Sequence, residues 1–144
     1  METLRTKIIK SPDSIEDAKS VRVAVFQVEQ EIAQDIDFDG RDDEATHIVI
    51  YDAETPVGTG RMRQISAGQV KIERIAVLKN SRKLGIGRII MSGIHEYLKE
   101  IGIAEATLDA QQQAKGFYEK LGYQQEGDVF EEAGIPHVVM TKKI

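Results

Sequence analysis

Hydrophobic positions along the chain follow two periods, one typical of strands and one typical of helices. Alternating or continuous apolar runs predict seven strands, at residues 6–9, 46–52, 56–65, 70–78, 104–110, 123–129 and 137–143. Spacings of three and four residues predict helices at 12–25, 28–34, 86–101 and 114–121. This order predicts an α/β (α+β) sheet layered with helices, antiparallel in its first half and parallel around the helix at 86–101.

Local signals set several of these boundaries. Ser11 and Pro12 are expected to start the first helix, with serine as its N-cap and proline at its first position. Gly102 and Gly122 are placed to end the two later helices. The 144 residues fit a single domain, residues 1–144.

Charge and composition narrow the function. Nineteen basic and 24 acidic residues give a net charge of −5, which disfavours nonspecific adhesion to nucleic acid or membranes. The chain has no cysteine, so a disulfide, a thiolate metal site and a cysteine nucleophile are excluded. No apolar run has the length of a signal peptide or a membrane span, and we expect a cytoplasmic protein.

The stretch IAVLKNSRKLGIGRII, residues 75–90, has the character of an anion-binding loop. A helix N-terminus presents unpaired N–H groups and partial positive charge. Gly85 and Gly87 let that backbone approach an anion closely, and Arg82, Lys83 and Arg88 add positive charge. The residues after Gly87 match neither a Walker loop nor a dinucleotide fingerprint.

The pattern Arg-x-x-Gly-x-Gly at 82–87, after a strand and before an amphipathic helix, resembles motif A of the GNAT superfamily of N-acetyltransferases. The later segment AQQQAKGFYEKLGY resembles the GNAT helix that carries a Phe-Tyr pair. DEATHIVIYD and EEAGIPHVVM are similar to segments of the small bacterial ElaA-like branch. This resemblance implies a GNAT fold, with a mixed sheet of about six or seven strands that splay apart after the fourth, and about four helices.

The resemblance also implies roles for individual residues. The pantetheine arm of coenzyme A would lie along strand residues Ile75, Ala76 and Val77, and an N–H near Val77 would stabilise the developing oxyanion. Tyr118 would protonate the departing thiolate, although a core aromatic is the plain structural alternative. The pyrophosphate would be held by Arg82, Lys83, Leu84, Gly85, Ile86, Gly87 and Arg88. Gln111, where many family members carry asparagine, and Ala114 would complete the cofactor contacts.

The sequence offers several candidates for the general base that takes a proton from the acceptor amine. Glu73 shares strand parity with Ile75 and Val77, so it could face the acceptor, yet a solvated or ion-paired glutamate fits the same pattern. A base at the spacing used by some GNAT enzymes would fall nearer Lys71. His47 and His137 lie in predicted strands, where each is either an acceptor contact or a hydrogen-bonded structural residue. His95 is expected on the surface of the helix at 86–101.

The acidic run DIDFDGRDDE, residues 35–44, resembles part of a calcium loop. Asp35, Asp37, Asp39 and Gly40 match the first ligand positions, but Thr46 stands where the bidentate glutamate belongs, so we reject calcium. A solvated turn or a rim that attracts a cationic amine remains. Arg22, on the first helix, either faces this acceptor side or pairs with these carboxylates.

Together these features predict an acetyl-CoA-dependent N-acetyltransferase that transfers the acetyl group directly to an amine, with no metal. Direct transfer follows because the chain offers no cysteine and no Ser/His/Asp arrangement. A non-catalytic acyl-CoA sensor or partner module, and a nucleotide-dependent enzyme, are the alternatives. We expect a small-molecule or peptide amine as the acceptor. Homodimers are common in the family, and the sequence leaves the oligomeric state open.

Overall fold

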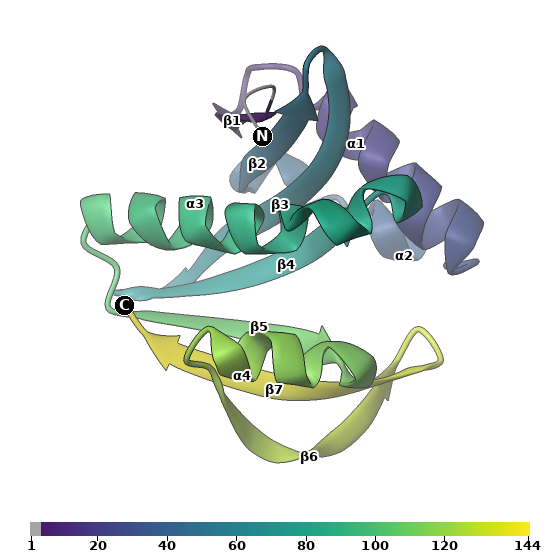
Figure 1. Ribbon diagram of the computed structural model, residues 1–144. Helices are drawn as coiled ribbons and strands as arrows, with labels where there is room; N and C mark the ends of the chain where they lie inside the picture. The colour runs from purple at the N-terminus through teal and green to yellow at the C-terminus, as the bar shows by residue number, and fades with distance from the viewer. Residues whose placement is uncertain (1–3) are drawn as a thin grey trace.

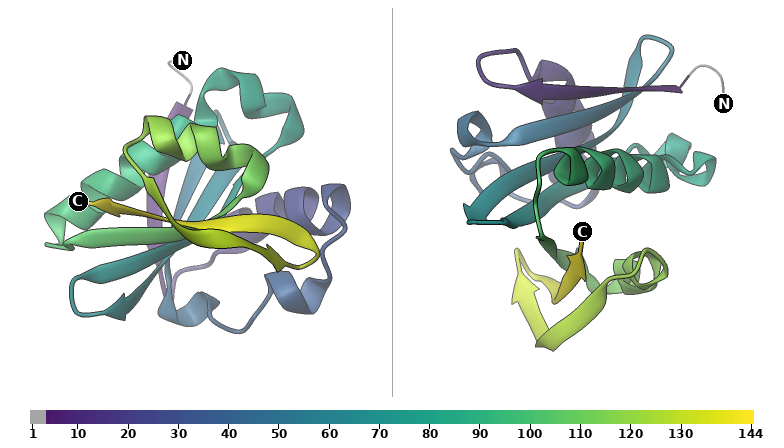
Figure 2. Two further views of the ribbon diagram at one scale, coloured as in Figure 1. Left: turned by 90° about the horizontal axis from the view of Figure 1, so that it is seen from below. Right: turned by 90° about the vertical axis from the view of Figure 1, so that its left-hand side faces the viewer.

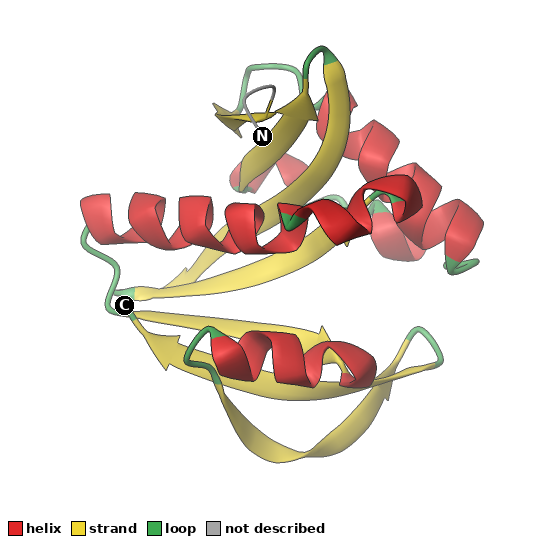
Figure 3. Ribbon diagram, in the orientation of Figure 1, coloured by secondary structure: helices red, strands yellow, loops and turns green. Residues whose placement is uncertain are grey.

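Seven strands form one mixed sheet in the computed structural model, which describes residues 4–144 (Figures 1 and 3). The spatial order is β1-β2-β3-β4-β5-β7-β6, and every neighbouring pair is antiparallel except β4–β5. The strands are β1 (Leu4–Lys10), β2 (Thr46–Asp52), β3 (Thr55–Ser66), β4 (Gln69–Val77), β5 (Glu105–Gln111), β6 (Gln124–Glu132) and β7 (Ile135–Lys143). The predicted α/β class and strand positions are confirmed.

The parallel pair β4–β5 stays together over only four residues of each strand. Gln69–Ile72 pair with Glu105–Leu108, and there the ladder ends. Beyond it β4 follows β3 as far as Val77, while β5 follows β7 as far as Gln111. The two halves of the sheet therefore diverge like a V (Figure 1), which confirms the predicted splaying after the fourth strand.

A β-bulge marks the place where β4 leaves β5. Thr59 pairs with Ala76 and Arg61 pairs with Glu73, so two residues of β4 lie opposite one of β3. Arg74, inside the bulge, has a φ of 55°, a left-handed conformation that is rare for a residue with a side chain. Bulges bend a strand and increase its twist, and this one turns β4 away from β5.

Helices cover both faces of the first half of the sheet (Figure 2). The α-helices are α1 (Glu16–Arg22), α2 (Gln34–Asp37), α3 (Ile86–Glu100) and α4 (Lys115–Lys120). On β2, Ile48 and Ile50 share a core cluster with buried side chains of α3, whereas Val49 packs with Ala18 of α1 on the other face. Alternate residues of one strand thus serve two cores. Helix α4 lies over β5 and β7 (Figure 1).

Near the N-terminus, the helix predicted at 12–25 is present but its predicted start is wrong, and the helix predicted at 28–34 is wrong. Ser11 and Pro12 do not start a helix; they lie in a turn closed by the Asp13 N–H on the carbonyl of Lys10, and α1 begins at Glu16. The helix predicted at 28–34 is absent. Instead a π-helical segment, Val23–Glu29, continues α1, and the chain then bends before α2. The helices predicted at 86–101 and 114–121 are confirmed as α3 and α4.

Candidate active site

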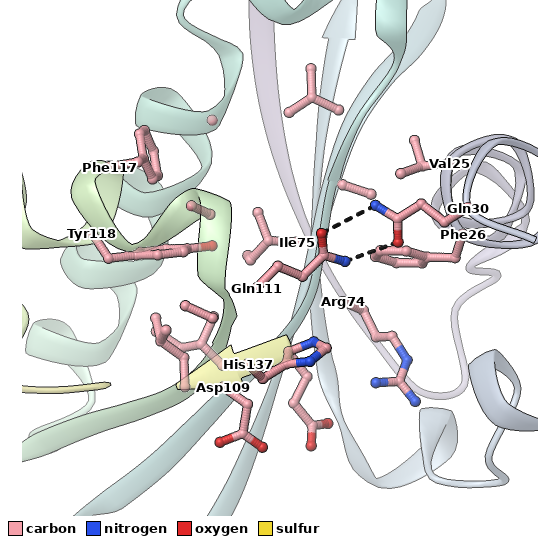
Figure 4. Close-up of a pocket in the computed structure, with 18 of the residues that line it drawn as sticks. Val25, Phe26, Gln30, Arg74, Ile75, Asp109, Gln111, Phe117, Tyr118 and His137 are labelled. Carbon is pink, nitrogen blue, oxygen red and sulfur yellow. Dashed lines mark hydrogen bonds between the residues drawn. The ribbon is translucent and has the colours of Figure 1, made fainter. Parts of the chain in front are cut away.

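A cleft of about 550 Å³ opens where β4 and β5 part (Figure 4). Its walls come from the π-helical segment and β4 on one side, and from β5, α4 and β7 on the other. Such a site between diverging strands is typical of small-molecule binding. The predicted site residues that line it are Glu73, Ile75, Ala76, Val77, Arg82, Gly85, Gly87, Arg88, Gln111, Ala114, Tyr118 and His137.

One end of the cleft is formed by the loop before α3. A 3-10 turn, Lys79–Leu84, leads to Gly85, whose φ of 73° favours glycine, and α3 begins at the next residue. A Cβ at Gly87 would lie 3.3 Å from the Phe117 ring, so the absence of a side chain keeps this entrance open. Ile86 is fully buried, so it can serve a ligand only through its backbone. Lys83 and Leu84 are exposed and lie outside the cleft lining.

Among residues 4–144, no strand pairs with the edge of β4 that faces β5 from Glu73 to Val77. A free strand edge presents N–H and C=O groups that an extended amide chain can pair with, as an added strand does. The Val77 carbonyl already accepts a hydrogen bond from Arg82 Nε at 3.1 Å. Across the gap, Gln111 and Ala114 line the opposite side. The residues that could hold an extended amide chain are therefore those of the free β4 edge, with Gln111 and Ala114 opposite them.

Arg82, the first residue of the predicted phosphate loop, is engaged by a carboxylate. Its NH1 and NH2 groups donate to the two carboxylate oxygens of Glu29 at 2.7 and 2.5 Å. A hydrogen bond from Arg82 lowers the pKa of Glu29. The pair joins the end of the π-helical segment to the loop, and a diphosphate bound there would compete with Glu29 for the guanidinium.

Tyr118 points its hydroxyl into the cleft (Figure 4), although only 7% of the residue is exposed. The rings of Phe117 and Tyr123 contact it edge-on, with centroids 5.0 and 5.8 Å away. Within residues 4–144 no group hydrogen-bonds the hydroxyl, and burial raises its pKa. The phenol therefore stays protonated and has a proton to donate.

Glu73 lines the same cleft, but arginines hold its carboxylate. Arg61 donates to one oxygen and Arg63 donates to both, at 2.5–2.9 Å. Burial alone would raise the pKa of Glu73, yet the hydrogen bonds from Arg63 and the charge of Arg61 lower it to about 2. A carboxylate this weakly basic is a poor proton acceptor, so the geometry weighs against the predicted role as general base.

Arg22 and His47, predicted to contact the acceptor, lie outside the cleft lining and are 1% exposed. Arg22 donates to the carboxylates of Asp37 and Asp42, and His47 Nε2 hydrogen-bonds the Asp42 carbonyl at 3.0 Å. Their placement gives no support to contact with an acceptor. The structure instead shows the alternative prediction, in which Arg22 pairs with carboxylates of the acidic run.

The acidic run is a solvated turn only in part: Asp35, Asp43 and Glu44 are exposed, whereas three of its aspartates pair with arginines. Asp37 is buried and bonds Arg22, while Asp39 and Asp42 bond Arg61, which is 0% exposed. Buried guanidinium groups require such partners, because an unpaired charge away from water is costly. Within residues 4–144, no three His, Cys, Asp or Glu side chains form a group that could hold a metal ion.

His137 faces the cleft from β7. Its Nδ1 lies 2.6 Å from the Ile135 carbonyl, and its Nε2 lies 3.7 Å from a carboxylate oxygen of Glu132. The Phe130 ring stacks on the imidazole, with centroids 5.9 Å apart. By contrast, the third histidine, His95, is partly buried rather than on the surface as predicted, and its Nε2 bonds the Tyr123 hydroxyl at 2.7 Å.

Several cleft residues were missed from the sequence. Gln30, at the end of the π-helical segment, exchanges two hydrogen bonds with Gln111, so the two amides span the cleft (Figure 4). Phe26 and Arg74 also line it. No local signal marks them, because each reaches the cleft through an irregularity: a π-helical segment for Phe26 and Gln30, and a β-bulge for Arg74. Irregular backbone of both kinds is frequent at functional sites.

Comparison with known proteins agrees with this geometry. The family model for an acetyltransferase (GNAT) domain matches residues 13–144. Among Bacillus subtilis proteins, the uncharacterized protein YyaT is 44% identical over 144 residues, covering 98% of this chain and 97% of YyaT. The uncharacterized N-acetyltransferase YjcF is 41% identical, covering 96% and 99%. Escherichia coli ElaA superposes with a TM-score of 0.86 at 26% identity, covering 96% and 99%. The chain therefore belongs to the GNAT family, as an N-acetyltransferase with ElaA among its structural neighbours.

Proposed function

We propose that this enzyme transfers the acetyl group of acetyl-CoA directly to an amine of a small-molecule or peptide acceptor. One observation carries the proposal: a single cleft runs from the loop before α3, along the unpaired edge of β4, to the hydroxyl of Tyr118. In this proposal the loop binds the diphosphate, the strand edge pairs with the amides of pantetheine, and the phenol lies beside the departing thiol. The acceptor would enter from the remaining, polar side of the cleft.

Each part of the chain has a separate task in this reaction. Bound acetyl-CoA supplies a thioester whose carbonyl carbon an amine can attack. An N–H of the free edge near Val77 stabilises charge that develops on the carbonyl oxygen. Tyr118 hydrogen-bonds the departing sulfur, and Arg82 and Arg88 hold the diphosphate. No covalent enzyme intermediate is needed, and the sequence has no cysteine to form one.

Freeing the acceptor nitrogen is the more demanding step. A lysine-like ammonium has a pKa of about 10.4, so deprotonation at pH 7 costs roughly 4.6 kcal/mol. A thiol with a pKa near 8.5 is already a fair leaving group. Catalysis should therefore depend more on the group that takes the proton from the amine than on Tyr118.

Within residues 4–144, no helix is long and apolar enough to cross a bilayer. We propose, from the sequence composition, that the reaction takes place in the cytoplasm.

The proposal is tested by calorimetry with CoA and by thiol release from acetyl-CoA with a panel of amines. Gly87→Asp should weaken CoA binding by at least about 100-fold, because the new side chain adds bulk beside Phe117 and a negative charge against the diphosphate. Gly87 suits this test better than Gly85, where the left-handed backbone would itself be strained by a side chain.

Gly116→Asp is the matched control. It adds the same charge to a helical glycine outside the cleft lining, where a Cβ meets nothing within 4 Å. Equal CoA binding by the wild type and Gly87→Asp would refute the loop assignment. Tight CoA binding with no thiol release for any amine would instead support a non-catalytic acyl-CoA sensor.

A further inference from the structure

Polar side chains of three strands meet on the face of the sheet away from α4. Residues directly opposite one another in antiparallel strands share a face, and His137 lies opposite both Gln111 of β5 and Phe130 of β6. Asp109 shares that face because it is two residues from Gln111. The adjacent residue Ala110 is buried in the same core cluster as Tyr118. His137 and Tyr118 therefore approach the cleft from opposite faces.

The hydrogen bond of His137 fixes which ring nitrogen carries the proton. A backbone carbonyl can only accept, so Nδ1, 2.6 Å from the Ile135 oxygen, must be the donor. In the neutral ring the lone pair is then on Nε2. No group among residues 4–144 hydrogen-bonds Nε2, and the residue lines the cleft. The stacked Phe130 ring restricts rotation of the imidazole.

The surroundings of Nε2 suit a cation. Glu132, from β6, places a carboxylate oxygen 3.7 Å away, too far for a hydrogen bond but close enough for both groups to contact one ammonium. Asp109 adds a second carboxylate to this side of the cleft, paired with Lys71 at 3.1 Å. The cationic side chains nearby, Lys71 and Arg74, are both engaged by carboxylates.

From this geometry we infer that His137 is the general base of the reaction, and that Glu132 helps to bind an acceptor that arrives as a cationic amine. The inference rests on the proposed acetyl transfer. The ammonium gives one proton to Nε2, its nitrogen attacks the thioester carbon, and the carbon–sulfur bond breaks. The second proton lost by nitrogen ends on the thiol, and the proton on Nε2 returns to solvent.

Two amines of similar size test this role. Ethylamine is an ammonium at neutral pH, whereas 2,2,2-trifluoroethylamine is mostly neutral because its fluorines withdraw electrons. His137→Ala should lower kcat/KM by about 100-fold with ethylamine, a typical loss for a general base, and by less than about fivefold with the fluorinated amine. Binding of CoA should not change. Equal losses of kcat/KM with both amines would overturn the inference, because a residue with a merely structural role should affect the charged and the neutral amine alike.

Glu132→Gln and Glu131→Gln form a matched pair on the same strand. Both glutamates are exposed, but only Glu132 lines the cleft. Glu132→Gln should raise KM for ethylamine by about threefold to tenfold, a modest effect because solvent screens this carboxylate, and Glu131→Gln should leave it unchanged. An equal KM in the two variants would refute the role of Glu132.

A nitrogen NMR spectrum of the histidine rings tests the inference without turnover. The wild type should show Nδ1 protonated and Nε2 unprotonated in His137, and ethylammonium should shift the Nε2 resonance. A proton on Nε2 in the neutral ring, or no response to ethylammonium, would overturn the assignment. Absence of acetyl transfer to either amine alongside the expected spectrum would count against the proposed reaction, while the base site itself would stand.

Discussion

The cleft has one wall formed by β4, with the arginines of β3 paired to it from outside the lining, and another built from β5, β7 and α4. The two walls differ in how their polar side chains are paired. On the first wall, Glu73 accepts hydrogen bonds from Arg61 and Arg63, and Arg61 also bonds Asp39 and Asp42. On the second wall, the Tyr118 hydroxyl and His137 Nε2 have no hydrogen-bond partner among residues 4–144.

This difference in hydrogen bonding distinguishes polar groups that stabilise the fold from polar groups that are available for proton transfer. A carboxylate that accepts several charged hydrogen bonds is fixed in place and has lost most of its basicity, as the pKa of about 2 for Glu73 shows. A buried polar group without a partner is costly, and such a group at the surface of a cleft is available to a ligand. We therefore assign the first wall to stability and positioning, and the second to proton transfer.

The largest effect should follow from breaking the first wall. Arg61→Met leaves the carboxylates of Asp39, Asp42 and Glu73 without their shared cation, which should lower the free energy of unfolding by about 3–5 kcal/mol. Urea unfolding at pH 7 measures the loss. Arg41→Met is the control, because Arg41 pairs with Glu44 on the surface and should change stability by less than about 0.5 kcal/mol. Similar stabilities of the two variants would contradict a structural role for this wall.

An intermediate effect, on rate instead of stability, is expected from the second wall. Tyr118→Phe should lower kcat by about 10- to 100-fold and leave CoA affinity and stability nearly unchanged, because the hydroxyl bonds no described residue. The loss is moderate because a phenol is a weaker acid than a thiol, so it stabilises the leaving sulfur mainly as a hydrogen-bond donor.

Tyr123→Phe is the matched control for Tyr118→Phe. Its hydroxyl bonds His95 away from the cleft lining, so this variant should lose about 1 kcal/mol of stability and keep its kcat. If Tyr118→Phe resembled Tyr123→Phe in both stability and kcat, with chemistry rate-limiting, Tyr118 would be a packing residue.

Features that depend on a short segment could be predicted from the sequence. Gly85 and Gly87 flank the start of a helix of regular period that follows an apolar strand. Both signals are local, so the position of the turn before α3 and the start of α3 were predicted correctly. The position of Tyr118 at the cleft followed from the resemblance of its helix to other GNAT enzymes. Each of these inferences needs only a dozen neighbouring residues.

Features that depend on tertiary contacts could not be predicted in this way. Arg61 and Arg63 stand on either side of Met62, and Glu73 follows Ile72, which is also the pattern of a solvated strand face. Arg61 is fully buried because residues 37–42 fold over it and bring the carboxylates of Asp39 and Asp42 to the sheet, and Arg63 and Glu73 are partly buried beside it. A solvated turn and an arginine-bound loop have the same sequence signature, and only the fold distinguishes them.

The smallest effect concerns the ion pair at the rim of the first wall, between Glu29 and Arg82. Both side chains are partly exposed, so the pair contributes little to stability, yet it occupies the arginine that we propose holds the diphosphate. Glu29→Gln should free Arg82 and tighten CoA binding by about twofold to fivefold at low salt, with the gain disappearing at high salt.

Calorimetry at two salt concentrations measures this change, and Glu31→Gln is the control, since it removes the same charge two residues away from a side chain that does not pair with Arg82. Equal affinity changes in the two variants would show a general charge effect. Weaker CoA binding by Glu29→Gln would mean that the glutamate holds Arg82 in its binding position instead of competing with the ligand. The ion pair would then serve positioning, as the rest of that wall does.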